Sequence, residues 1–401
     1  MNKMKVWLVS PNERKYLTSA GDRMPLPILY LSSALTENGI DNECWDLNHT
    51  HWLDFTYRCQ KFKPDIVGLS IISSPSYPQM KRLAKEIRPY VGTIVAGGFH
   101  TTTLPESLNG DVNVIIRGEG ESQLVNLITE RNEEFDINRY PIPDRSKLDS
   151  NKYNMKLLGL KIAGITTARG CPFGCAFCGN VNKTVHFRDK HNIEEEVKQI
   201  KGLGYEAVYF YNESHTINKK HAFEVGEIMK RYKMKYRLET RANLIDEKTS
   251  KMLSDTGCMM VALGIESGDD KVLDAINKKE YVDDYRRAVK LLSKDGIPTK
   301  GYFIFGLPQQ DLTSALKSIE LAKELKKEGM VMADFYQLTP FPGSPITANP
   351  EKYGVRILHH DYKKYLQASS YVINPVIETE WLSREGIKSL VERARIEFKN
   401  A

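Results

Sequence analysis

The chain has 401 residues, of which 41% are apolar and 27% are charged, and these values are typical of a globular protein with two or three domains. Its net charge of +6 comes from basic residues scattered among acidic ones, a pattern that indicates a solvated surface rather than a nucleic-acid-binding one. No apolar run reaches the roughly 18 residues of a membrane span, and the six cysteines do not form a disulfide framework, so a reducing, cytoplasmic location is expected.

Residues 1–130 alternate between strand and helix signals, and the apolar start of the chain is more typical of a first strand than of a signal peptide. Short apolar runs predict strands, and amphipathic stretches between them predict helices. This alternation favours an α/β domain with a doubly wound, Rossmann-like parallel sheet. The predicted strands are Val6–Ser10, Ile66–Ile72, Thr93–Ala96 and Val112–Ile116, and the predicted helices are Leu26–Asn38 and Gln79–Val91.

Small and polar residues stand where these predicted strands end. Ligands of doubly wound sheets bind at the carboxyl ends of the strands. We therefore expect a binding edge that includes Ser70, Ser73, Gly97, Gly98 and Gly118.

Residues 131–160 are polar, contain Pro141 and Pro143, and are typical of a linker. From Lys161 the alternation starts again, and six strand–helix units predict a partial (β/α)6 TIM-like barrel over residues 161–344. A small α-rich region, helical from Ser383 to Phe398, follows over residues 345–401. The six predicted strands are Ile162–Thr167, Ala207–Tyr211, Lys235–Thr240, Met259–Ile265, Thr299–Gly306 and Met332–Leu338.

Three cysteines, Cys171, Cys175 and Cys178, lie in one short loop after the first barrel strand, on the face where barrel enzymes carry their chemistry. Three thiolates are one too few for a closed tetrahedral site, but they can hold a [4Fe–4S] cluster with one open iron. The alternative is a zinc or other structural site, for which His186 and His191 are candidate fourth ligands.

The cysteine run resembles the signature of the radical S-adenosylmethionine (SAM) enzymes, including the aromatic Phe177 before the last cysteine. Four more segments resemble the ends of this family's third to sixth strands: 239–243, 261–268, 301–308 and 338–345. The resemblance implies that the open iron chelates SAM and that one electron, from a donor such as flavodoxin or ferredoxin, releases a 5′-deoxyadenosyl radical.

The same resemblance implies a set of SAM-binding residues at the strand ends. Carboxylates suit the ammonium group and the ribose diol of SAM, and a guanidinium suits its carboxylate. A surface ion pair or a strand-end cap is the alternative role for each residue. The expected set is Glu213, Arg241, Glu266 and Ser267, with Phe177 and Gly179 near the adenine.

The amino-terminal half resembles the cobalamin-binding domain fused to one class of radical SAM enzymes, in the segments 24–31, 95–100 and 117–121. One departure is that Pro11–Pro27 contains no histidine, whereas many cobalamin proteins supply one to cobalt in an Asp-x-His-x-x-Gly motif. We expect cobalamin with its own base displaced and no histidine ligand; the alternative is a sheet that has lost the cofactor. The implied cobalamin residues are Ser70, Ser73, Gly97, Gly98, His100, Gly118 and Glu119.

Both halves together favour a cobalamin-dependent radical SAM C-methyltransferase. It would move a methyl group from SAM via methylcobalamin to an unactivated carbon, after hydrogen abstraction by the 5′-deoxyadenosyl radical. The main alternative is an enzyme of the same architecture that catalyses a rearrangement, cyclisation, coupling or oxidation, with or without cobalamin. A noncatalytic iron–sulfur or corrinoid regulator is the third reading. The substrate, a small molecule or a peptide or protein side chain, cannot be read from the sequence.

Overall fold

The computed structural model describes residues 4–14, 22–139, 141–365 and 373–401. The chain divides into two compact units: unit 1 comprises Met1–Gly164 with His191–Leu203, and unit 2 comprises Ile165–Lys190 with Gly204–Ala401. Among the described residues, no helix is both long and apolar enough to cross a membrane. The domain limits expected from the sequence, including a linker over 131–160, stay a prediction.

Unit 1 contains a five-stranded parallel sheet with the strand order β2-β1-β3-β4-β5. This order, with β1 beside both β2 and β3, confirms the doubly wound, Rossmann-like sheet. In register, Ser70 at the end of β3 pairs with Gly97 at the end of β4. The strands are β1 (Val6–Ser10), β2 (Asn42–Asp46), β3 (Ile66–Ser70), β4 (Thr93–Gly97) and β5 (Val114–Ile115).

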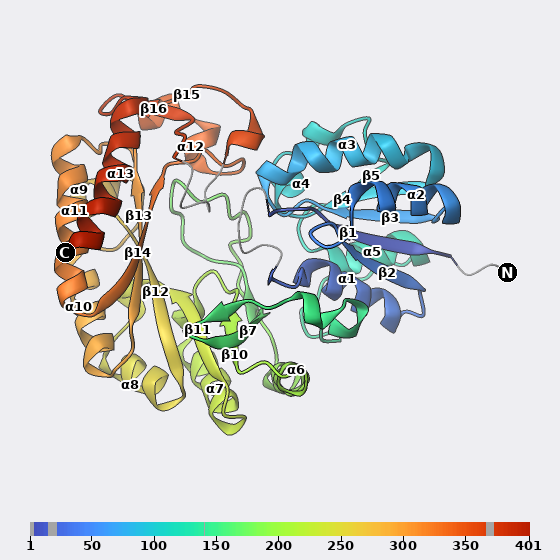
Figure 1. The fold of residues 1–401 in the computed structure, drawn as a ribbon, viewed down its shortest axis with the longest axis horizontal. Helices are drawn as coiled ribbons and strands as arrows, with labels where there is room; N and C mark the ends of the chain where they lie inside the picture. The colour runs from blue at the N-terminus through green and yellow to red at the C-terminus, as the bar shows by residue number, and fades with distance from the viewer. Residues whose placement is uncertain (1–3, 15–21, 140, 366–372) are drawn as a thin grey trace. The chain divides into compact units, whose positions relative to one another are not determined.

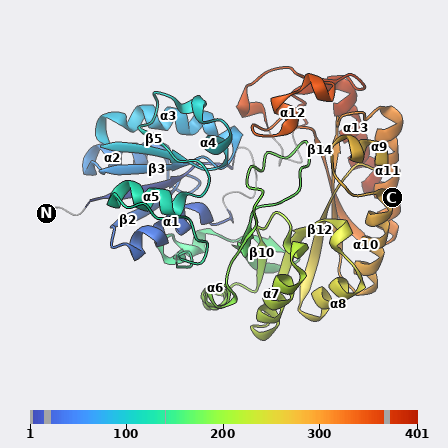
Figure 2. The ribbon, with the colours of Figure 1, turned by 180° about the vertical axis from the view of Figure 1, so that it is seen from behind.

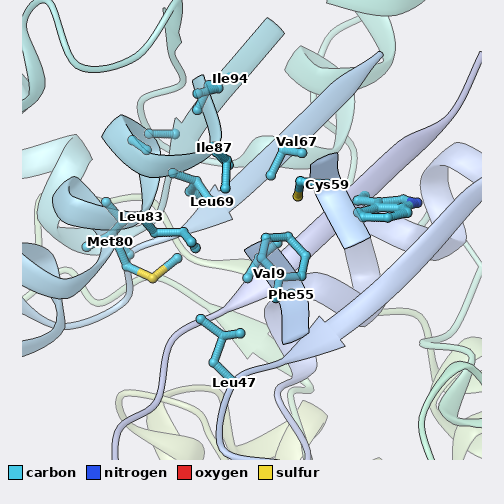
Figure 3. Packing of buried hydrophobic residues seen from close by; sticks show 14 of the residues in the cluster. Val9, Leu47, Phe55, Cys59, Val67, Leu69, Met80, Leu83, Ile87 and Ile94 are labelled. Carbon is cyan, nitrogen blue, oxygen red and sulfur yellow. The ribbon is translucent and has the colours of Figure 1, made fainter. Parts of the chain in front are cut away.

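Helices cover both faces of this sheet because its central strands are apolar on both sides (Figure 1). Val6 and Leu8 pack on one face with α1 (Leu26–Glu37) and α5 (Gly120–Thr129). Trp7 and Val9 point to the opposite face, where α2 (Trp52–Phe62) and α3 (Tyr77–Ile87) complete the second core. Figure 3 shows the side chains of that core, among them Phe55, Cys59, Met80 and Leu83.

We did not predict strand β2 or helix α2 from the sequence. Strand β2 lies at the edge of the sheet and pairs with β1 alone, so its sequence Asn-Glu-Cys-Trp-Asp lacks a continuous apolar run. Helix α2 buries only Phe55 and Cys59, one helical turn apart. The side chain of His51, the residue before α2, accepts a hydrogen bond from the backbone of Leu53 and so caps the helix.

The segment 131–160 belongs to unit 1 and carries a buried ion pair with α6 (Lys190–Gly202). Nη2 of Arg145 lies 2.6 Å from Oε1 of Glu196, and the two side chains are 2% and 0% exposed. Arg145 also donates to the side chain of Gln199 and to the carbonyl of Gly164, each at 2.8 Å. These bonds attach the segment firmly to α6.

Unit 2 contains parallel strands in the order β14-β13-β12-β11-β10. The amide of Tyr211, just after β10, donates to the carbonyl of Ile165, the last residue of β7 (Leu160–Ile165). All six strands predicted for the barrel are therefore present, within about two residues at each end. They continue as β10 (Ala207–Phe210), β11 (Lys235–Thr240), β12 (Cys258–Glu266), β13 (Thr299–Phe305) and β14 (Met330–Gln337).

The helices that flank the curled sheet of unit 2 pack on one of its faces (Figure 2), and among the described residues the inner face carries no helix. The packing helices include α7 (Lys219–Arg231), α8 (Glu247–Asp255), α10 (Val282–Lys294) and α11 (Leu312–Lys327). The predicted carboxy-terminal helix is confirmed as α13 (Arg384–Asn400), which packs against β14. Smaller elements in unit 2 are β8 (Ala168–Arg169), β9 (His186–Phe187), α9 (Asp270–Ala275), α12 (Pro345–Ala348), β15 (Val355–Ile357) and β16 (Ile377–Thr379).

Candidate functional site

The three cysteines lie in a loop that begins just after β7 and is closed at its base by the β8–β9 pair. Within the loop, the amide of Cys171 donates to the carbonyl of Asn182 at 3.0 Å. Gly170 has a φ of +99°, and a Cβ there would lie 2.0 Å from the carbonyl oxygen of Thr184, so only glycine fits.

The far end of the loop is attached to neighbouring segments through its backbone. The amide of Ala176 donates to the carbonyl of Ile276 at 2.8 Å, and the amide of Ile346 donates to the carbonyl of Ala176 at 3.0 Å. The side chain of Asn277 donates to the carbonyl of Gly174 at 2.8 Å. The cysteines are thus carried on a backbone that is fixed at several points.

All six cysteines of the chain are free thiols. Burial raises the pKa of Cys171 and of Cys178, while the backbone amides of Phe173 and Asn180, directed at the two sulfurs, oppose this effect. Inward-pointing amides of this kind stabilise thiolates and the sulfurs of a bound cluster.

Among the described residues, no three His, Cys, Asp or Glu side chains gather around a position for a single metal ion, and neither His186 nor His191 forms such a group with the cysteines. A cubane cluster does not require this convergence, because each thiolate binds a different iron. The donor set of three closely spaced free thiols with amide support fits a [4Fe–4S] cluster with one open iron.

Arg241, the first residue after β11, reaches the cysteine loop. Its Nη1 lies 3.7 Å from Sγ of Cys175, and its guanidinium lies over the ring of Phe173 at 3.9 Å. Its Nη2 donates to the carbonyls of Lys278 and Lys279. The side chain is 7% exposed, and its Nε has no hydrogen-bond partner among the described residues.

A buried group of charges adjoins Arg241. Nζ of Lys278 lies 3.1 Å from Oε1 of Glu266 and 3.4 Å from Oε2 of Glu280. Nη2 of Arg241 also lies 3.4 Å from Oε2 of Glu280. The side chains of Lys278, Glu266 and Glu280 are 5%, 9% and 0% exposed. Burial lowers the pKa of Lys278, but Glu266 and Glu280 outweigh it and hold that pKa above its usual value.

Glu266 ends β12 with a φ of +64°, an uncommon left-handed conformation for a residue with a side chain. Its carboxylate lies above Gly264, where a Cβ would come within 2.5 Å of Oε1 of Glu266 and 3.0 Å of Nζ of Lys278. Glycine at position 264 therefore leaves the space that the ion pair occupies.

The structure brings some of the expected SAM residues together and separates others. Arg241 and Glu266 share the buried charge group, and exposed Glu213 is close enough to Cys171 to affect its thiol electrostatically. Ser267 is buried and directed toward α11, where its Oγ lies 3.4 Å from Oγ of Ser318. Half-buried Phe177 and buried Gly179 flank Cys178.

Lys278 and Glu280 were not predicted from the sequence as residues of the site. They lie in the run Asn-Lys-Lys-Glu, which is typical of a solvated surface. Asn277 and Lys279 both have φ values above +50°, and this backbone turns Lys278 inward while Asn277 and Lys279 stay exposed. A single sequence contains no pattern that predicts such a turn.

The expected cobalamin residues of unit 1 gather at the carboxyl edge of its sheet, apart from His100. Ser70 and Gly97 end paired strands, Ser73 follows β3, and Gly98 follows β4. Gly118 has a φ of +79° and open space where a Cβ would stand. Glu119 is the residue before α5. An edge of short side chains with open space above a glycine fits a flat corrin that approaches the backbone.

His100 is fully buried within unit 1 and takes a packing position. Its Nδ1 lies 3.0 Å from Oγ of Ser74, its Nε2 lies 3.2 Å from Oγ of Ser107, and its ring stacks on Tyr77 at 4.5 Å. Burial lowers its pKa to about 4, so the ring is neutral. Part of the Pro11–Pro27 stretch, residues 15–21, lies outside the described residues.

Comparison with known families finds two matching models. The radical SAM superfamily model matches residues 165–336, and the B12 binding domain model matches residues 16–128.

Two relatives align with nearly the whole of this chain. An uncharacterized methyltransferase of Pyrococcus horikoshii is 28% identical over an alignment of 446 positions, which covers 99% of this chain and 93% of that protein. An anaerobic magnesium-protoporphyrin IX monomethyl ester cyclase of Rubrivivax gelatinosus is 26% identical over an alignment of 431 positions, which covers 95% of this chain and 75% of that protein.

Among solved structures, the chain is similar to the radical SAM methyltransferase TsrM of Kitasatospora setae with cobalamin and a [4Fe–4S] cluster bound. The TM-score is 0.81 at 17% identity, over 98% of this chain and 91% of that one. This similarity supports the same fold.

Proposed function

Since this chain belongs to the cobalamin-binding radical SAM enzymes, we propose that it is a C-methyltransferase that acts on an unactivated carbon. Its cofactors are a [4Fe–4S] cluster, SAM and cobalamin. The observation that carries the proposal is the presence in one chain of the three-cysteine loop and the B12-type sheet. An unactivated carbon cannot attack a sulfonium directly, so its methylation needs both a radical source and a separate methyl carrier.

The residues of unit 2 would hold the cluster and SAM. Cys171, Cys175 and Cys178 would bind the irons. Arg241 would neutralise charge beside Cys175, and Glu213 and Glu266 would accept hydrogen bonds from the ammonium and diol of SAM. Phe177 and Gly179 would border the adenine, whereas the orientation of Ser267 toward α11 supports a structural role for it.

In unit 1 the carboxyl edge of the sheet would hold the corrin, with Ser70, Ser73, Gly97, Gly98, Gly118 and Glu119 as the residues nearest to it. When bound, the cofactors would supply a 5′-deoxyadenosyl radical and a transferable methyl group. The electron would come from a donor protein such as flavodoxin or ferredoxin. The free state of all six cysteines supports a reducing, cytoplasmic setting.

The test is anaerobic purification with iron and hydroxocobalamin, followed by an absorption spectrum and a SAM-cleavage assay with dithionite. The wild-type protein should elute with corrin bands and form 5′-deoxyadenosine. Cys175→Ala should lose the cluster and SAM cleavage, while Cys258→Ala, which removes a buried thiol elsewhere in unit 2, should keep both. Corrin that elutes apart from the protein, or SAM cleavage retained by Cys175→Ala, would contradict the proposal.

A non-methylating reaction is the second candidate, because the cyclase of Rubrivivax gelatinosus shares both halves with this chain. Methyl-labelled SAM separates the two functions once a product is known. Label in the product supports methyl transfer, and an unlabelled product with consumption of SAM supports the alternative.

A further inference from the structure

The sulfur atoms of the three loop cysteines have different hydrogen-bond donors. Backbone amides are directed at the sulfurs of Cys171 and Cys178. Sγ of Cys175 instead accepts a hydrogen bond from a charged group, Nη1 of Arg241, at 3.7 Å. Lys278 is a second cation that is close enough to Cys175 to interact with it electrostatically. The donor at Cys175 is therefore a buried cation rather than an amide.

The protein itself fixes the guanidinium of Arg241. Its Nη2 donates to the carbonyls of Lys278 and Lys279, and its plane lies over the ring of Phe173 at 3.9 Å. Nη2 also lies 3.4 Å from Oε2 of Glu280. The side chain of Arg241 is only 7% exposed. Its charge is therefore held in one place, where water screens it weakly.

Glu280 compensates this positive charge. Its Oε1 accepts a hydrogen bond from the backbone amide of Asn243 at 3.0 Å, and its Oε2 lies 3.4 Å from the nearest nitrogen of both Arg241 and Lys278. Oε2 has no hydrogen-bond partner among the described residues, so it interacts with the two cations through charge. The side chain is 0% exposed. Glu280 therefore reduces the positive potential that the two cations produce at the cysteine loop.

These charges bear on the electron that a cluster accepts. Reduction of a [4Fe–4S] cluster adds one negative charge to it, so a buried cation beside a cluster thiolate favours the reduced state, and a buried anion disfavours it. At an effective dielectric constant of about 20, one charge within about 7 Å changes the ratio of reduced to oxidised cluster by about tenfold or more. An exposed charge has a much smaller effect, because water and salt screen it.

We propose that the buried group of Arg241, Lys278, Glu266 and Glu280 sets the reduction potential of the cluster before SAM binds. Arg241 acts through Cys175, and Glu280 is a positioning residue that acts through Arg241. Loss of the Arg241 charge should make the cluster harder to reduce, and loss of the Glu280 charge should make it easier to reduce. A group that only stabilises the fold would not produce shifts of opposite sign. This inference rests on the proposed function, because it concerns the cluster of the same enzyme.

The test is an anaerobic redox titration of the full-length, cluster-loaded protein without SAM or cobalamin, in which electron paramagnetic resonance measures the reduced cluster. In Arg241→Gln the ratio of reduced to oxidised cluster at a fixed potential should fall about tenfold or more, which is a shift of about 59 mV for one electron. Arg241→Lys keeps the charge and should show a smaller fall. In Glu280→Gln the ratio should rise about threefold or more, because two carbonyls still hold Arg241 and its charge is less compensated.

Lys279→Gln is the matched control. It removes a cation from the residue next to Lys278, but this side chain is exposed, so the ratio should change by less than about twofold. A ratio in Arg241→Gln within twofold of the wild-type value, or a fall in Glu280→Gln, would overturn the inference. If Arg241→Gln binds no cluster, the sign of the shift in Glu280→Gln decides the inference alone.

SAM cleavage by the wild-type protein is measured in parallel. If the wild-type protein cleaves SAM but the two variants do not shift in opposite directions, the inference fails and the proposed function stands. If the wild-type protein binds a cluster and does not cleave SAM, the proposed function fails and the titrations still decide the inference. If it binds no cluster, both fail.

Discussion

Replacement of Lys278 by Met should strongly destabilise unit 2, because it leaves Glu266 and Glu280 buried without their ammonium. At distances of 3.1 and 3.4 Å and an effective dielectric constant of about 20, each ion pair contributes about 5 kcal/mol of Coulomb attraction. Much of this attraction offsets the desolvation of the three charges. The removal of one partner from a buried ion pair typically costs about 3–5 kcal/mol.

The assay is urea unfolding monitored by hydrogen exchange and mass spectrometry of β12 and β13 peptides, so that unit 2 is followed separately from unit 1. With an m-value of about 3 kcal/mol/M, the expected loss lowers the midpoint by about 1 to 1.7 M. Lys279→Met is the matched control: Lys279 is the next residue and is exposed, and its variant should shift the midpoint by less than about 0.2 M. Equal shifts for the two variants would refute the assignment of Lys278 to a buried charge group.

Three further predictions follow from buried positions. Gly264→Ala should disrupt the Glu266–Lys278 pair and lower the unit 2 midpoint, as the same exchange experiment can show. Glu196→Ala should destabilise unit 1 by about 3–5 kcal/mol, because it leaves the buried charge of Arg145 without its carboxylate. Urea unfolding followed by tryptophan fluorescence measures this effect, since unit 1 holds three of the four tryptophans. In the folded protein the pKa of His100 is about 4, below the usual value near 6.5, so the unfolded chain binds a proton first as the pH falls. The free energy of unfolding of unit 1 should therefore fall by about 2 kcal/mol between pH 7 and pH 5. In His100→Gln this fall should be correspondingly smaller.

The parallel strands could be predicted from the sequence because buried strands need continuous apolar runs. Ile66–Ser70 and Thr299–Phe305 are examples. Strand β2 could not, because an edge strand is half-solvated and its apolar residues are few. The cysteine loop was identified because its chemistry requires a fixed local spacing.

The surroundings of the cysteines depend on backbone turns that a single sequence does not reveal. The left-handed residues Asn277 and Lys279 turn Lys278 into the site, and the left-handed Glu266 turns its own carboxylate toward that ammonium. Ser267 consequently faces α11, although a strand-end position alone suggested the same site as for Glu266. His100 illustrates the same limit, since its glycine-rich context suggested a ligand edge but its ring is buried between two serines.

Methyl transfer through cobalamin is tested most directly by the mass of the protein-bound corrinoid after anaerobic incubation of the reduced protein with SAM that carries a trideuterated methyl group. This measurement needs no knowledge of the substrate. We expect a corrinoid that carries the trideuterated methyl group in native wild-type protein, and no labelled corrinoid in protein that was denatured before the incubation. A corrinoid that never acquires the label, in protein that retains bound cobalamin and SAM, would show that cobalamin does not carry the methyl group.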